Sequence, residues 1–202
     1  MQRVTVDELR QLAADARESI WEQAEELDRE PKIYLHWTAG HYFSKFDSYH
    51  VNIDGDGVLW LMDDLDELLS HTWHRNSGAV GITLCCCVGA DTESLGDEPP
   101  TAAQLDAMAQ ATCAIADGLW LTIDKKHVLT HGEAADNEDG EDIHEDYGPR
   151  TDCERWDLEY LETQDSPEFD PWAEDGSRGG DVLRRMANAV RAAHNARALG
   201  KQ

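Results

Sequence analysis

The stretch GAVGITLCCCVGA, residues 78–90, constrains the fold most, because it is continuously apolar and bounded by glycines. A strand with one wet face alternates apolar and polar residues, whereas this run offers no polar face. It therefore predicts a central strand that is buried on both sides. Its adjacent thiols, Cys85 to Cys87, read as small core residues; neighbours on a strand point to opposite faces, so we expect them to stay reduced.

The remaining segments alternate between helix and strand patterns, which predicts a single α/β (α+β) domain with a central mixed β-sheet flanked by helices. Helices are expected at residues 6–29, 102–118, 155–162 and 181–198. The other strands are expected at residues 32–38, 49–53, 58–62 and 126–131. Two of these strands form a hairpin around the turn Asp-Gly-Asp-Gly. Residues 132–155 and 163–180 are expected to be loops.

The charge balance of the 202 residues excludes two classes of partner. There are 17 Lys and Arg against 42 Asp and Glu, a formal net charge of −25. Such a surface repels nucleic acid and anionic lipid. The first residues are charged and amphipathic, and no run approaches the ~18 apolar residues that cross a membrane. We therefore expect a protein made in the cytoplasm without a signal peptide, with no membrane insertion.

Two acidic segments are candidates for binding a divalent cation. Residues 52–63, NIDGDGVLWLMD, carry oxygen ligands at EF-hand offsets, but the last position is Asp63 instead of Glu and both flanks are strand-like where an EF-hand has helices. The hairpin turn is the better interpretation. The acidic loop 134–146 has no apolar anchor, so we expect it to be solvated and mobile.

Two of the nine histidines, His36 and His131, each follow an apolar strand-like run and precede small residues. The end of a strand is where a rigid scaffold presents a side chain to an open cleft. Catalytic zinc sites use three protein ligands from His, Asp, Glu or Cys and leave a fourth position for water. Two histidines and a carboxylate would meet that count, although a single strand-end histidine is more often structural. Glu133, two residues past His131, is expected to face solvent, with a hydrogen bond to a ligand imidazole as the alternative.

Five blocks, IYLHWTAG, YHVNIDGDG, WHRNSGAVGITL, LTHGEA and RWDL, follow one another over roughly residues 32–161. In this order they resemble the zinc-dependent N-acetylmuramoyl-L-alanine amidases, the family shared by phage amidase endolysins and peptidoglycan recognition proteins. The resemblance implies that family's fold, Zn²⁺ as cofactor and peptidoglycan or muropeptides as the partner. Residues 31–162 would form the amidase core, residues 1–30 an N-terminal helix, and residues 163–202 a C-terminal loop and helix packed on that core.

The resemblance also implies roles for individual side chains. His36 and His131 match zinc ligands, and Tyr49 matches a tyrosine that assists catalysis in the phage enzymes. The substrate groove would be formed by Trp37, Thr38, Trp73, His74 and Asn76.

The chain departs from the family pattern at the third ligand. Family members place Cys or Asp two residues after a lysine that polarises the scissile amide, whereas RTDCERWDL offers two Arg-x-Asp matches. Asp157 with Arg155 is preferred, because Trp156 can anchor that segment on the core, and Asp152 remains the alternative ligand. Thr83 stands where many members carry a catalytic glutamate, so we expect Tyr49 to take a larger part in catalysis.

The implied reaction is zinc-dependent hydrolysis of the amide between N-acetylmuramic acid and L-alanine in peptidoglycan, with Arg155 stabilising the oxyanion and Tyr49 orienting the attacking water. The enzyme would act on the cell wall in the periplasm or outside the cell. It would arrive there as a phage endolysin or as a secreted antibacterial effector, the latter with secretion machinery and an immunity protein as partners. The alternative is a non-catalytic peptidoglycan-binding module of the same fold.

Overall fold

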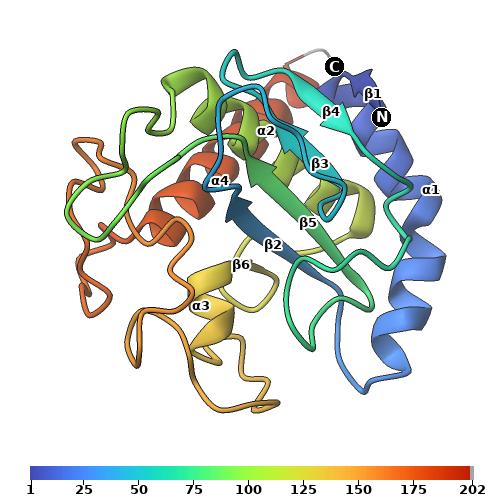
Figure 1. Ribbon diagram of the computed structural model, residues 1–202. Helices are drawn as coiled ribbons and strands as arrows, with labels where there is room; N and C mark the ends of the chain where they lie inside the picture. The colour runs from blue at the N-terminus through green and yellow to red at the C-terminus, as the bar shows by residue number, and fades with distance from the viewer. Residues whose placement is uncertain (201–202) are drawn as a thin grey trace.

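The computed structural model describes residues 1–200 and holds one six-stranded mixed sheet in the order β1-β4-β3-β5-β2-β6 (Figure 1). The strands are β1 (Gln2–Val4), β2 (Lys32–Trp37), β3 (Val51–Ile53), β4 (Leu59–Leu61), β5 (Ala79–Leu84) and β6 (Val128–Thr130). Strand β5 lies between β3 and β2, runs parallel to both, and is buried along its whole length. The predicted central buried strand and the mixed α/β fold are confirmed.

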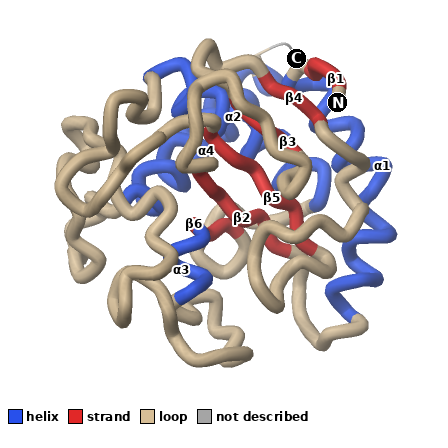
Figure 2. Tube along the Cα trace, in the orientation of Figure 1, coloured by secondary structure: helices blue, strands red, loops and turns tan. Residues whose placement is uncertain are grey.

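Within residues 1–200, four helices accompany the sheet: α1 (Val6–Glu25), α2 (Ala102–Leu119), α3 (His131–Ala135) and α4 (Gly179–Leu199). In Figure 1, α2 and α4 lie behind the sheet and α1 runs along its right-hand side, and α1 and α4 both pack against α2. Long loops pass over the opposite face (Figure 2). None of the helices within residues 1–200 is long and apolar enough to cross a membrane. Side chains from α1 and α4 join one buried cluster around β5, so both ends of the chain share the same core.

The β3–β4 hairpin is confirmed, and its turn is closed by Asp54. The Asp54 carboxylate accepts hydrogen bonds from the backbone N–H groups of Asp56 and Val58, both at 3.1 Å, and from the indole N–H of Trp60 at 2.7 Å. A calcium loop would need this carboxylate as a ligand, but here its oxygens accept the hydrogen bonds that hold the turn. Strand β1, which pairs with β4 at the sheet edge, was not predicted, because three residues are too few to show a period.

Two local predictions are wrong. Residues 155–162 form turns instead of a helix, since Leu158 and Glu162 adopt left-handed backbone conformations with φ of 60° and 50°. The predicted strand 126–131 and loop 132–155 meet inside helix α3, of which His131 is the first residue. A capping box starts this helix: the Thr130 hydroxyl accepts from the Glu133 N–H, and the Glu133 carboxylate accepts from the Thr130 N–H.

Gln104, in the first turn of α2, ties this helix to the sheet. Its buried amide donates to the carbonyl oxygens of Ile53 at 3.1 Å and Cys85 at 2.8 Å, and accepts from the N–H of Thr101 at 3.0 Å. One side chain therefore satisfies backbone groups at the ends of β3 and β5 and at the start of α2.

We expect Gln104→Leu to lower the free energy of unfolding by about 1–3 kcal/mol, because the Cys85 carbonyl loses its donor while the Ile53 carbonyl keeps the N–H of Cys85. Urea unfolding followed by circular dichroism measures this loss. Gln110→Leu is the control on the same helix, since the Gln110 amide makes only a surface hydrogen bond with Asp106. Equal losses in the two variants would contradict the role assigned to Gln104.

Candidate metal centre and groove

The register of two parallel strands brings His36 and His131 together. Leu35 of β2 is paired with Thr130, the last residue of β6, so His36 in β2 and His131 at the start of α3 follow a paired position and lie at the same end of the two strands. The Nδ1 atoms of the two imidazoles lie 3.2 Å apart. Residues 95 positions apart in the chain thus face each other because of one β-pairing.

Asp157 completes a group of three. Its Oδ2 atom lies 3.6 Å from the Nδ1 atom of each imidazole, and all three residues are buried. The segment is anchored by Trp156, whose ring packs edge-on against Trp37 with centroids 4.6 Å apart. Asp152 does not belong to this group within the described chain; it is exposed and accepts the N–H of Glu154.

The spacing of these three atoms fits a zinc ion. At 3.6 Å the carboxylate is too far from either nitrogen to form a hydrogen bond, so it faces both rings without bonding to them. A tetrahedral zinc ion with bonds of about 2.0–2.1 Å holds its ligand atoms about 3.3 Å from one another. The observed separations of 3.2, 3.6 and 3.6 Å lie close to that value.

The electrostatics suit metal ligands as well. Burial lowers the pKa of His36 to about 4, although the nearby Asp157 carboxylate acts to raise it. Burial acts to raise the pKa of Asp157, but the facing imidazoles of His131 and His36 hold it below its ordinary range. His36 is therefore neutral and Asp157 ionised at neutral pH, which are the protonation states that bind a metal.

The candidate centre opens into two adjoining cavities of ≈ 440 and ≈ 990 Å³. His131, His71 and Arg155 line both, while Asp157 and Tyr49 line the smaller one. The Tyr49 ring lies against the His36 ring, with centroids 4.9 Å apart. Burial and the Asp157 charge raise the pKa of Tyr49, so its phenol keeps its proton at neutral pH.

The five predicted groove residues all line these cavities: Trp37 and Thr38 the smaller one, and Trp73, His74 and Asn76 the larger. These five side chains differ in how far they are exposed to a substrate in the cavities. Trp73 is 58% exposed, whereas Trp37 is 6% exposed and belongs mainly to the core. The Asn76 side-chain oxygen accepts the backbone N–H groups of His71 and Thr72 and so shapes its own loop.

Arg75, which the sequence analysis did not single out, anchors the acidic loop. Its fully buried guanidinium donates to both carboxylate oxygens of Asp139, at 2.7 and 3.0 Å, and to the side-chain oxygen of Asn137 at 2.8 Å. The expectation of a solvated, mobile loop rested on the lack of an apolar anchor and did not allow for this polar one, which buries Asp139 although several later residues of loop 134–146 are exposed. The loop places His144 in a stack with Trp73, with ring centroids 5.4 Å apart, and so builds a wall of the larger cavity.

Glu133 neither faces solvent nor bonds to an imidazole. It is 1% exposed, and both its carboxylate oxygens accept from the Arg184 guanidinium of α4, at 2.7 and 2.8 Å. A second buried pair joins Arg178 to Glu159 at 2.6 and 2.9 Å. Both carboxylates lie two residues from a member of the candidate centre.

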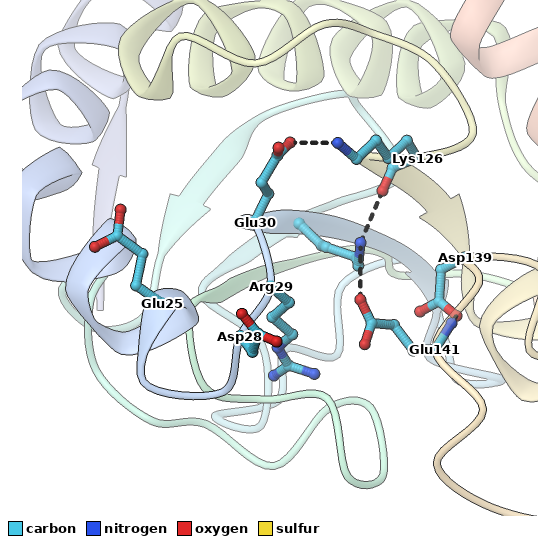
Figure 3. Close-up of a pocket in the computed structure, with 8 residues that line it drawn as sticks. Glu25, Asp28, Arg29, Glu30, Lys126, Asp139 and Glu141 are labelled. Carbon is cyan, nitrogen blue, oxygen red and sulfur yellow. Dashed lines mark hydrogen bonds and ion pairs between the residues drawn. The ribbon is translucent and has the colours of Figure 1, made fainter.

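A separate charged cavity of ≈ 450 Å³ lies at the start of β2, at the opposite end of this strand from His36 (Figure 3). Two ion pairs join charged groups of its lining. Lys126 contacts Glu30 at 2.8 Å, and the Lys32 ammonium donates to the Lys126 carbonyl at 3.0 Å and lies 3.6 Å from Glu141. Its lining contains neither histidine nor cysteine.

Comparison with known proteins identifies a family that this sequence matches. The family model described as N-acetylmuramoyl-L-alanine amidase, Amidase_2, matches residues 13–154, which is well over half of the chain. The match includes His36, Tyr49 and His131 and ends just before Asp157. No protein with a curated description matches.

Two solved structures from Clostridium intestinale URNW are similar: the endolysin N-acetylmuramoyl-L-alanine amidase LysCS and the N-acetylmuramoyl-L-alanine amidase LysC. Identities are 18% and 16%, and TM-scores are 0.42 and 0.41. Each comparison covers 52% of this chain, and 72% and 73% of those chains, respectively. On the strength of the family model, the chain belongs to the N-acetylmuramoyl-L-alanine amidase family.

Proposed function

We propose that this protein is a zinc-dependent hydrolase that cleaves the amide bond between N-acetylmuramic acid and L-alanine in peptidoglycan. The observation that carries the proposal is the spacing of the His36, His131 and Asp157 ligand atoms at the junction of two cavities. Membership of the amidase family supports the substrate class.

His36, His131 and Asp157 would hold the metal, with Asp157 preferred over Asp152 because only the former faces both imidazoles. A zinc ion held there would supply Lewis acidity and lower the pKa of a water that it coordinates. His36 and Asp157 already have the protonation states that a cation requires, so no further proton has to leave them when it binds.

Tyr49 and Arg155 are the catalytic residues that the geometry supports. The protonated phenol of Tyr49 beside His36 can donate a hydrogen bond to a reacting oxygen or nitrogen. Arg155 lines both cavities, and its side chain is 47% exposed. Its permanent positive charge can offset the negative charge that develops on the scissile carbonyl oxygen.

The two cavities suit a substrate with two chemically different arms. Because they meet at His131, an amide bound there would place the glycan side in one cavity and the peptide side in the other. Exposed Trp73 offers an apolar face to the substrate in the larger cavity.

Cell-wall hydrolysis requires the enzyme to act in the periplasm or outside the cell, after release as a phage endolysin or delivery as an effector. An effector would be accompanied by an immunity protein that inhibits the purified enzyme, whereas an endolysin would have none. Screening the products of neighbouring genes for inhibition of the purified enzyme distinguishes the two routes.

The first prediction concerns the metal. We expect the purified protein to contain about one zinc per chain by elemental analysis, and to release free stem peptides from peptidoglycan, as detected by mass spectrometry. Asp157→Ala should lose both properties, because two imidazoles alone hold zinc weakly, and a chelator should abolish peptide release. Asp152→Ala, the control on the same loop, should retain both.

A wild-type protein that binds peptidoglycan but releases no peptide with zinc present would overturn the hydrolase and favour the binding module. Loss of zinc in Asp152→Ala, and not in Asp157→Ala, would instead move the third ligand to Asp152.

The second prediction concerns the phenol of Tyr49. Tyr49→Phe keeps the ring against His36 and removes the hydroxyl, so zinc content should be unchanged while kcat falls by about 10²-fold, the lower end for a general acid–base group. Steady-state kinetics on a soluble muropeptide measure this change. Tyr147→Phe, in the larger cavity, should leave kcat nearly unchanged. Equal effects of the two substitutions would assign Tyr49 to groove packing.

A further inference from the structure

Thr72 and His71 lie on the far side of the His36 ring from the candidate metal position. The Nδ1 atom of His36 faces His131 and Asp157, and its Nε2 atom lies 3.3 Å from the Thr72 hydroxyl oxygen. The same hydroxyl lies 2.9 Å from the Nδ1 atom of His71. All three side chains are buried, with exposures of 0%, 2% and 5% for His36, Thr72 and His71. A single hydroxyl thus bridges two imidazoles.

When His36 binds a cation through Nδ1, the positions of the protons allow the hydrogen bonds of this bridge to run in only one direction. A neutral imidazole carries one proton, so a lone pair on Nδ1 places the proton on Nε2. The Nε2–H group then donates to the Thr72 oxygen, and the Thr72 hydroxyl donates to the unprotonated Nδ1 of His71. Every hydrogen bond in the bridge is satisfied in that arrangement.

The surrounding loop is built to hold this bridge. The Asn76 side-chain oxygen accepts the backbone N–H groups of His71 at 3.2 Å and Thr72 at 2.8 Å, which fixes both residues. The His71 ring lies directly over Gly81 of β5, where an added Cβ atom would come within 2.6 Å of the ring. Glycine at that position leaves the space that the imidazole fills.

His71 also keeps a buried polar atom that packing alone does not explain. Within the described residues its Nε2 atom makes no hydrogen bond of standard geometry, although the Ala79 backbone lies within weak hydrogen-bond reach of the ring, and such a poorly satisfied buried nitrogen destabilises the fold. An apolar side chain would fill the same space without that loss. The nitrogen that is used, Nδ1, is the one that faces Thr72.

We infer that Thr72, held by His71, is a positioning residue that fixes the tautomer and ring orientation of His36 for metal binding. Partners of this kind on the far nitrogen of a ligand imidazole commonly change metal affinity by about 10–100-fold. The inference rests on the proposed zinc site, and its test separates the two.

The test is Thr72→Val, which removes the hydroxyl and nearly preserves the shape of the side chain. We expect its zinc affinity, measured by competition with a chromophoric chelator, to fall by about 10–100-fold. The visible absorption spectrum of the cobalt-substituted protein should also change, because the His36 ring is no longer held in one orientation. Thr72→Ser, which restores the hydroxyl, should recover most of the affinity.

Thr112→Val is the matched control, since Thr112 is buried on α2 and its hydroxyl has no partner within the described residues. It should bind zinc as the wild type does, and circular dichroism of the metal-free proteins checks that every variant is folded at the temperature of the zinc assay. Wild-type affinity in Thr72→Val, or an equal loss in Thr112→Val, would overturn the positioning role while leaving the zinc site intact. A wild-type protein that binds no zinc would overturn the site itself.

Discussion

His36 of β2 and His131, the first residue after β6, lie side by side because β2 and β6 run parallel with Leu35 opposite Thr130. This register decides the geometry of the proposed site. A slip of one residue would turn one imidazole to the other face of the sheet, since side chains alternate along a strand. The buried strand β5 pairs with β2 on its other side and fixes the position of β2 within the sheet. The long apolar run at residues 78–90 thereby constrains the site as well as the fold.

Buried ion pairs extend this constraint to the C-terminal helix. Arg184 and Arg178 of the α4 segment bind Glu133 and Glu159, which stand two residues from His131 and Asp157. The two glycines that follow Arg178 permit the approach: a Cβ atom on Gly180 would lie 2.6 Å from the Glu133 carboxylate. Breaking a buried pair leaves an uncompensated charge and costs about 3–5 kcal/mol. A displacement of α4 would therefore disturb two of the proposed ligands.

The sequence predicts those features whose signal is local. The central strand, the hairpin and helix α2 follow from runs of apolar residues, an Asp-Gly turn and a threonine cap, and all are present. His36 and His131 were selected as strand-end histidines, but their meeting depends on a register that no spacing encodes. The anchor of the acidic loop was missed for a related reason: Arg75 and Asp139 are 64 positions apart, and a polar pair has no period. The start of helix α3 could have been predicted, since Thr130 and Glu133 form a capping box that is visible in the sequence.

The positions of the arginines bear on the roles proposed for Arg155 and Tyr49 in the two cavities. Three of them, Arg75, Arg178 and Arg184, are buried and neutralised by carboxylates, so they contribute little positive charge to the surface. Among the described residues that line the two cavities, Arg155 is the single lysine or arginine. Where related enzymes use lysine, arginine keeps its charge at every accessible pH and cannot give a proton to the leaving amine. In the proposed reaction, Tyr49, whose raised pKa keeps its phenol protonated, would donate a hydrogen bond beside His36, while Arg155 would offset the developing negative charge.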